Sequence, residues 1–103
     1  MTTGELTKSA IEEIQYRFRG DVWRQNQISV RGRKFTGRVG LPDIIGHQIG
    51  TGRAIYCEVK NKGDKLSQEQ IDFMNQSSKN GAICLVMSWS DGYFQIKQWT
   101  ETK

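Results

Sequence analysis

The chain has 103 residues, of which 36% are hydrophobic and 10% aromatic, and it carries a formal net charge of +4 at pH 7. This length suffices for a single domain over residues 1–103 and leaves little for a second core. No apolar run is long enough to span a bilayer and no signal-peptide pattern opens the chain, which excludes a membrane protein and favours the cytoplasm. The cysteines Cys57 and Cys84 lie in apolar runs, as buried free thiols do, and one histidine, His47, makes a zinc site or a catalytic triad improbable.

The first 19 residues predict an amphipathic helix. It opens on a possible capping box, Thr2-Thr3-Gly4-Glu5, and Gly20-Asp21 ends it. Apolar residues recur at every fourth position along it, at Leu6, Ala10, Ile14 and Phe18. Glu5 and Glu12 lie away from the middle of this apolar face, where carboxylates are usually solvated but can also border a site.

A strand is expected over Asp21–Ile28, and a basic loop over Ser29–Gly40. Arg24 falls inside the strand, where an arginine is either exposed at a sheet edge or directed at an anion. Residues 21–42 contain one acidic side chain, Asp21, against five basic ones, Arg24, Arg31, Arg33, Lys34 and Arg38. Such a concentrated basic segment is either a solvated loop or a contact surface for a polyanion such as nucleic acid.

The next stretch predicts a hairpin that carries charges where strands are usually apolar. Leu41–Gly46 and Ala54–Lys60 read as its strands, joined by the glycine-rich turn Gln48–Arg53. If the hairpin is centred between Gly50 and Thr51, Asp43 and Glu58 face each other, with Cβ atoms roughly 4.5–5.5 Å apart. Lys60 then lies on the face of Glu58, about 6.5–7 Å further along the strand. Two opposed carboxylates repel each other and suit a divalent cation with oxygen ligands.

The remaining chain predicts a crossover helix between parallel strands. After the polar turn Asn61–Lys65, Ser67 is a candidate N-cap and Gln70 completes a capping box, and the helix is expected to bury Ile71 and Met74, with Phe73 as a further candidate. The helix stops at Asn80-Gly81, and the apolar run Ala82–Met87 is a buried strand parallel to Ala54–Lys60. Tyr93–Trp99 is a final, peripheral strand. The order α-β-β-β-α-β-β predicts an α/β fold, a mixed sheet with a helix on each face.

These residues resemble a known family. Pro42-Asp43, a fourteen-residue gap and Glu58-Val59-Lys60 are similar to the PD-(D/E)xK nuclease motif, whose superfamily has a restriction-endonuclease-like αβββαβ core. With Gly40-Leu41 before the motif and Leu66-Ser67-Gln68-Glu69-Gln70 after it, the chain resembles the small VRR-NUC proteins, many of them from phages. A phage protein of this kind would act in the host cytoplasm.

The resemblance implies a Mg²⁺- or Mn²⁺-dependent DNA endonuclease. Asp43 and Glu58 would be metal ligands, with the Val59 carbonyl as a possible third. Lys60 would orient or activate the attacking water, or stabilise the charge that develops at phosphorus. Gln70 matches the glutamine that the family places near the metal, alongside its capping role.

Related enzymes often add a glutamate from the first helix. The context of Glu12 resembles that glutamate, Glu5 keeps the spacing to Arg24 better, and the alignment of the helix puts Thr7 near the expected slot, so the choice stays open. The resemblance also gives Arg24 a match in a basic residue of the family. Together with the basic loop and the following turn, the expected DNA-binding residues are Arg24, Arg31, Arg33, Lys34, Arg38 and Lys62.

Three functions fit this sequence. The first is a structure-selective nuclease that acts as a homodimer on branched DNA such as Holliday junctions, because two-fold symmetry presents two sites to two strands. The second is a non-catalytic DNA-binding module of the same fold, and the third is a nuclease with sequence or flap preference. Three aromatic residues could serve a dimer interface, although core packing explains them more simply: Trp89, Phe94 and Trp99.

Overall fold

The computed structural model describes residues 2–25, 40–61, 63–90 and 93–100. Its elements follow the expected order, which is α1 Thr3–Phe18, β1 Gly20–Arg24, β2 Ile44–Gln48, β3 Ala54–Lys60, α2 Gln68–Lys79, β4 Ile83–Ser90 and β5 Tyr93–Gln98. Within these described ranges, no helix combines the length and the apolar character needed to cross a membrane. Five of the residues expected to bind DNA lie outside the described ranges, namely Arg31, Arg33, Lys34, Arg38 and Lys62.

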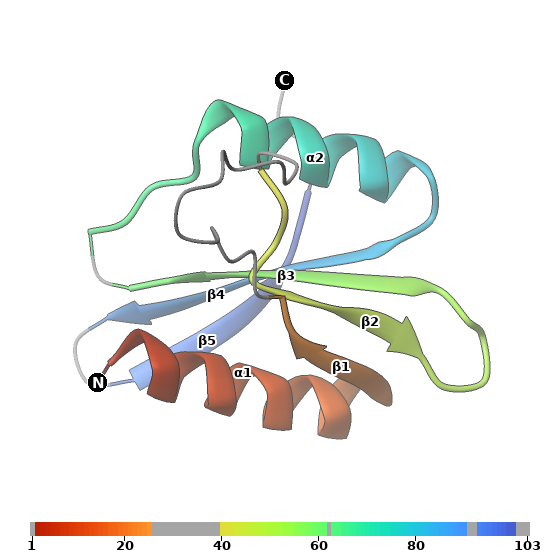
Figure 1. Ribbon diagram of the computed structural model, residues 1–103, viewed down its shortest axis with the longest axis horizontal. Helices are drawn as coiled ribbons and strands as arrows, with labels where there is room; N and C mark the ends of the chain where they lie inside the picture. The colour runs from red at the N-terminus through yellow and green to blue at the C-terminus, as the bar shows by residue number, and fades with distance from the viewer. Residues whose placement is uncertain (1, 26–39, 62, 91–92, 101–103) are drawn as a thin grey trace, which may run out of the picture.

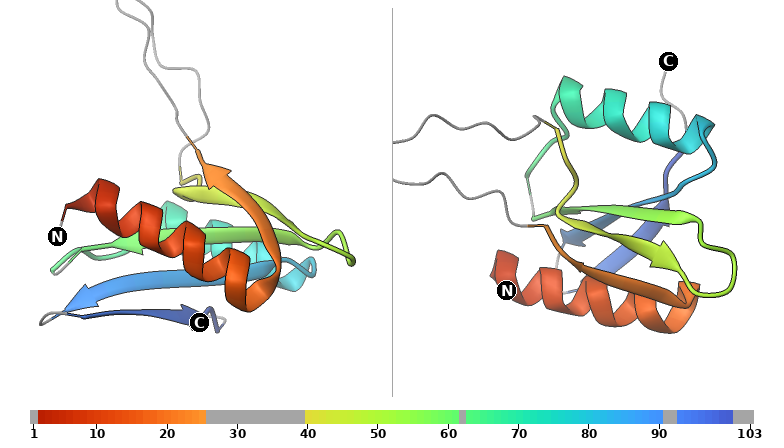
Figure 2. Two further views of the ribbon diagram at one scale, coloured as in Figure 1. Left: turned by 90° about the horizontal axis from the view of Figure 1, so that it is seen from below. Right: turned by 45° about the vertical axis from the view of Figure 1, so that its right-hand side comes forward.

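The five strands form one mixed sheet in the order β1-β2-β3-β4-β5. β3 and β4 are parallel, and the other neighbouring pairs are antiparallel. The two parallel strands are joined through α2, because a parallel pair requires a crossover between its ends. Helices α1 and α2 cover opposite faces of the sheet, as Figure 1 and Figure 2 show. The predicted α/β architecture is therefore confirmed.

Strand alternation divides the side chains of β3 between the two faces. Ile55, Cys57 and Val59 belong to the core cluster that α1 closes with Leu6, Ala10 and Ile14. Tyr56 packs on the opposite face, edge-on to Phe73 of α2 with ring centroids 4.9 Å apart. Because side chains in a strand point alternately to the two sides, Glu58 and Lys60 share the α2 face with Tyr56.

The predicted helix caps are confirmed, with small changes in where α1 ends and in which residues of α2 are buried. Thr2 caps α1 by accepting a hydrogen bond from the Glu5 amide at 3.1 Å. The helix ends at Arg19, which itself adopts the left-handed conformation with φ 52°, while Gly20 already begins β1. In α2, Ser67 and Gln70 form the complete capping box, and Phe73 and Met74 are buried. The expectation that Ile71 is also buried is wrong, since this residue is only half-buried at the edge of the helix.

Both cysteines and the late aromatic residues belong to the core. Cys57 and Cys84 are buried free thiols, as expected. Trp89 and Phe94 pack against the α1 cluster, and Trp99 packs against the α2 cluster. The Trp99 Nε1–H also donates to Asn75 Oδ1 at 2.9 Å. Core packing therefore accounts for these three aromatic residues.

Gly46 in β2 allows the backbones of β1 and β2 to approach closely. A Cβ at this position would lie 2.6 Å from Val22 Cα and would also collide with the Asp21 carbonyl oxygen. We predict that Gly46→Ala lowers the free energy of unfolding by about 1–3 kcal/mol or more, because backbone must move to admit the methyl group. Urea unfolding measures this loss. The control is Gly4→Ala in α1, where the Cβ meets open space apart from Thr2 Oγ1 at 3.9 Å; equal losses in both variants would contradict the prediction.

Candidate active site

The pairing of β2 with β3 brings the expected carboxylates together. Ile44 pairs with Cys57 and His47 with Ala54, so the next pair outward is Asp43 with Glu58. The predicted hairpin register, centred between Gly50 and Thr51, is confirmed. The same register continues into β4, where Val86 stands beside Glu58 and Ser88 beside Lys60. The carboxylates therefore lie at the carboxyl end of β3, on the face that α2 covers.

Asp43 lies where the chain departs from the regular ladder. Strand β2 begins only at Ile44, and the preceding chain, with buried Pro42, runs toward α2 (Figure 1). Asp43 Oδ2 accepts a hydrogen bond from the Val59 backbone amide at 2.7 Å. Its backbone carbonyl accepts from the amide of Gln25 at 2.7 Å. The Asp43 side chain is thus fixed against β3 through one oxygen.

Gly40 brings this segment against the start of α2. Its φ is +84°, and a Cβ there would lie 2.8 Å from the backbone oxygen of Glu69. Only glycine combines that backbone conformation with so close an approach. Glu69 is the residue before Gln70, so the contact sets the segment carrying Asp43 next to the helix turn carrying Gln70. In the sequence, Gly40 stands out only as part of the motif, and its place directly before Leu41-Pro42-Asp43 is the one signal for this packing role.

Glu58 is fully buried, which is unusual for a carboxylate. Its Oε2 accepts a hydrogen bond from Gln70 Nε2 at 3.1 Å. Its Oε1 is buried without a hydrogen-bond partner. Burial, followed by the negative charge of Asp43 and a side-chain hydrogen bond with Asp43, raises the pKa of Glu58 from 4.5 to about 8, against the opposing effect of the Lys60 ammonium. With both carboxylates ionised, Glu58 Oε1 therefore has no donor among the described residues, whereas a proton on Glu58 would be shared with Asp43.

Gln70 connects the carboxylate to the lysine. Its Oε1 accepts from Lys60 Nζ at 3.0 Å and from the Ser67 amide at 2.8 Å, while its Nε2 donates to Glu58. This network fixes the orientation of the amide, because a flipped side chain would point NH₂ at two donors. Gln70 thus serves both as the capping-box residue and as a neighbour of the acidic site.

The donor set fits a hard divalent cation. Two carboxylates side by side, one with an unpartnered buried oxygen, supply the charge and the oxygen atoms that Mg²⁺ or Mn²⁺ prefers. Within the described residues, no group of three or more His, Cys, Asp or Glu side chains is placed to hold a metal. Two carboxylates with water and a backbone carbonyl such as that of Val59 are a sufficient set for Mg²⁺, which keeps several waters.

The carboxylates of α1 are not brought to this pair. Glu5 and Glu12 are both exposed, and Glu5 Oε1 accepts a hydrogen bond from Thr2 Oγ1 at 3.2 Å. Thr7, at the slot where the family glutamate was expected, is buried at 4% exposure. A ligand role for Glu12 or Glu5 stays a prediction.

Arg24 lies on the other side of the sheet from the carboxylates. It pairs with Ile44, which belongs to the α1 core cluster, so strand alternation directs Arg24 toward the α1 face. The residue is exposed at the end of the edge strand β1. A DNA contact by Arg24 would therefore be made around the sheet edge.

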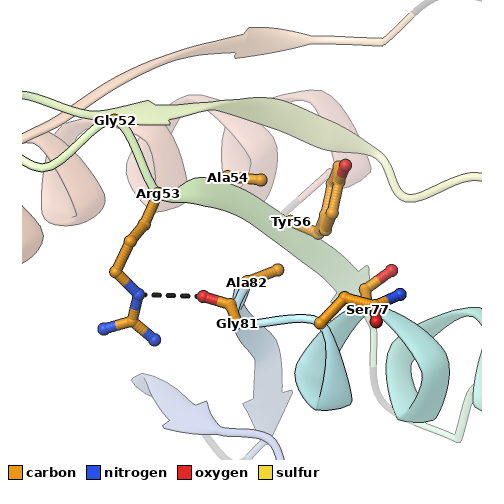
Figure 3. A pocket seen from close by; sticks show the side chains of 8 residues that line it. Gly52, Arg53, Ala54, Tyr56, Ser77, Gly81 and Ala82 are labelled. Atoms are coloured by element: carbon orange, nitrogen blue, oxygen red, sulfur yellow. Dashed lines mark hydrogen bonds between the residues drawn. The ribbon is translucent and has the colours of Figure 1, made fainter.

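A separate pocket lies at the opposite end of β3. Its volume is about 590 Å³, and Figure 3 shows Arg53 donating its Nε–H to the Gly81 carbonyl at 2.9 Å across it. The lining residues are Gly52, Arg53, Ala54, Tyr56, Ser77, Asn80, Gly81 and Ala82. Neither acidic residue of the candidate site contributes to it, so this pocket is distinct from the candidate active site.

The raised pKa of Glu58 predicts a pH-dependent stability of the metal-free protein. Between the ordinary pKa of 4.5 and the folded value of about 8, the folded state binds more protons than the unfolded state. Stability should therefore fall as the pH rises across this window. Glu58→Gln, which carries no charge at either pH, should remove this contribution, on the order of 3 kcal/mol between pH 5 and pH 8.

Urea unfolding in EDTA at pH 5 and pH 8 measures this difference. We expect the variant to be more stable than the parent at pH 8 and close to it at pH 5. The exposed carboxylate Asp72 provides the control, Asp72→Asn, which should follow the pH dependence of the parent. Equal pH dependence in the parent and in Glu58→Gln would contradict the prediction.

Comparisons with known proteins agree with this geometry. A family model described as the VRR-NUC domain matches residues 1–90. A solved VRR_NUC domain is similar over 87% of this chain and 87% of its own, with 26% sequence identity and a TM-score of 0.54. Hjc, a Holliday junction resolvase from the archaeal hyperthermophile Archaeoglobus fulgidus, shares the fold with a TM-score of 0.58 and 14% identity, over 92% of this chain and 75% of that chain. A comparison with curated proteins finds no match.

The family match covers most of the chain, including Asp43, Glu58, Lys60 and Gln70. The resemblance noted in the sequence is therefore confirmed, and the chain belongs to the VRR-NUC family, with the nuclease fold of that family.

Proposed function

We propose that this protein is a divalent-metal-dependent endonuclease that hydrolyses DNA phosphodiester bonds in the cytoplasm. The observation that carries the proposal is the buried Glu58 oxygen without a partner, directly beside the Asp43 carboxylate. Burying such a group costs stability unless a cation or a proton neutralises it. The membership of the chain in a nuclease family supports this reading of the site.

Asp43, Glu58 and the Val59 carbonyl would hold Mg²⁺ or Mn²⁺. Such an ion supplies Lewis-acid activation of the phosphodiester and lowers the pKa of a bound water. Asp43 uses one oxygen for the Val59 amide, so its other oxygen is the one available to a cation. The Asp43–Val59 hydrogen bond keeps the carboxylate in place whether or not the ion is bound.

Lys60 supplies fixed positive charge beside the two carboxylates. Its ammonium donates one hydrogen bond to Gln70 Oε1, and an ammonium has three N–H groups. The remaining donors can orient the attacking water or stabilise negative charge on the phosphate oxygens as the bond to phosphorus forms. Gln70 restricts Lys60 to this position, which reduces the reorganisation needed during the reaction.

We further propose that the preferred substrate is branched DNA, such as a Holliday junction, and that the active form is a homodimer. The shared fold with a Holliday junction resolvase supports the choice of substrate. A lone domain of 103 residues offers little surface to grip a branched molecule. A two-fold dimer would present two acidic sites to two strands of a junction.

Removing charge from either carboxylate tests the chemistry. We predict that Asp43→Asn and Glu58→Gln reduce the rate of DNA cleavage by at least about a thousandfold, because each removes a carboxylate ligand of the cation. DNA binding, measured by fluorescence anisotropy, should be unchanged or tighter, since less negative charge faces the phosphates. Asp72→Asn is the matched control and should cut like the parent. Cleavage by either site variant at the parental rate would rule out this assignment.

Substrate choice is tested with four DNAs of related sequence, namely a four-way junction, a flap, a splayed arm and a linear duplex. We expect cleavage in Mg²⁺ or Mn²⁺, none in EDTA, and a rate on the junction at least about tenfold above that on the duplex, with a dimer in light scattering. Cleavage of all four at equal rates would disprove structure selectivity. Binding without cleavage of any of them, in either metal, would favour the non-catalytic binding module.

A further inference from the structure

Trp23 is an exposed aromatic residue on the sheet face that carries the acidic site. Its side chain is 48% exposed, and it belongs to neither of the two core clusters. Val22, the residue before it, points into the α1 core. Strand alternation therefore places Trp23 on the opposite face, with Glu58 and Lys60. Core packing does not account for this side chain.

The sheet register connects Trp23 to the acidic site. Trp23 pairs with Ile45, and Ile45 pairs with Tyr56, which precedes Glu58 by two positions on the same face. Standard strand spacing and rise then place the Cα atoms of Trp23 and Glu58 about 12 Å apart. One DNA strand that crosses this face could therefore contact both side chains.

Helix α2, which covers this face of the sheet, packs on the half formed by β3 and β4. Helix α2 packs on Cys84 and Val86 of β4 and on Tyr56 of β3. Tyr56 and Ile45 are half-buried, whereas Trp23 on the edge strand β1 has nearly half its surface free. The row from Tyr56 to Trp23 therefore forms an apolar strip that opens outward from the acidic site.

We propose that Trp23 is a base-stacking platform for an unpaired nucleotide next to the phosphate that is cleaved. The proposal rests on the proposed nuclease function and identifies a structural source for the preference for branched DNA. In a paired duplex the bases are already stacked on each other, whereas a flap or a splayed arm carries unpaired bases, and a four-way junction exposes a base face where its pairs open at the branch. The net charge of +4 on the chain favours an anionic partner such as a nucleic acid over an apolar protein partner. Aromatic stacking of this kind accepts any base.

The test compares a splayed arm with a fully paired duplex of the same sequence, both bound by the Asp43→Asn variant so that no cleavage occurs. Adding Trp23→Ala should weaken binding to the splayed arm by about tenfold and leave binding to the duplex within about twofold. Trp23→Phe retains a ring and should recover most of the lost affinity. Tyr16→Ala is the matched control, because Tyr16 is 85% exposed on α1, across the sheet, and its loss should change neither affinity.

An abasic scan of the unpaired strand gives a readout that a structural role would not produce. One position beside the branch should lose affinity when its base is removed, and that loss should disappear in the Trp23→Ala variant. An abasic penalty that persists in Trp23→Ala, equal weakening on both DNAs, or a change in light-scattering mass without a change in affinity would each overturn the proposal.

A cleavage assay of the Trp23 variants with Asp43 restored separates the stacking proposal from the nuclease proposal. Cleavage that does not depend on Trp23, together with unchanged binding by Trp23→Ala, would disprove stacking and leave the nuclease intact. The expected Trp23 binding pattern without any cleavage in Mg²⁺ or Mn²⁺ would support the stacking site and disprove the nuclease.

Discussion

The buried carboxylate of Glu58 is the constraint on which the rest of the site depends. It lies at the centre of a five-stranded sheet with one oxygen unpartnered and a second carboxylate directly opposite. Isolated buried charge of this kind is unfavourable, and the raised pKa of Glu58 expresses that cost. Proteins retain such arrangements where charge is needed for binding or catalysis, so this local instability is evidence for a function.

The neighbouring structure keeps the two carboxylates in position without neutralising them. Val59 donates its amide to Asp43, and Gln70 donates its amide to Glu58. Each of these two hydrogen bonds occupies one oxygen of a carboxylate, and the remaining oxygens are left for a cation or for a proton shared between the two acids. Lys60 donates to Gln70 Oε1 and, within the described chain, forms no ion pair with Asp43 or Glu58, so its charge stays available to a ligand. The geometry therefore suits an incoming cation and an incoming phosphate together.

The parts of the fold that follow from local rules could be predicted from the sequence. The symmetric turn around Gly50 and Thr51 set the register that joins Asp43 to Glu58, and the capping box of Ser67 and Gln70 set the start of α2. Other features depend on contacts between distant segments. Gly40 meets Glu69 across the site, and no local pattern gives the departure of the chain from β2 that allows it. Similarly, strand alternation puts Arg24 and Trp23 on opposite faces, but which of them shares the face of the acidic site follows only once β1 is placed beside β2.

The choice of glutamine at position 70 follows from the three bonds that it makes. The side chain must accept from Lys60 and from the Ser67 amide, and must also donate to Glu58. A glutamate could accept the first two bonds, but when ionised it has no proton for Glu58 and would add a third negative charge. Only an amide of this length provides both an acceptor and a donor, so the cap of α2 and the acidic site share one side chain. The beginning of the helix and the arrangement of the site are consequently coupled, and neither can shift without disturbing the other.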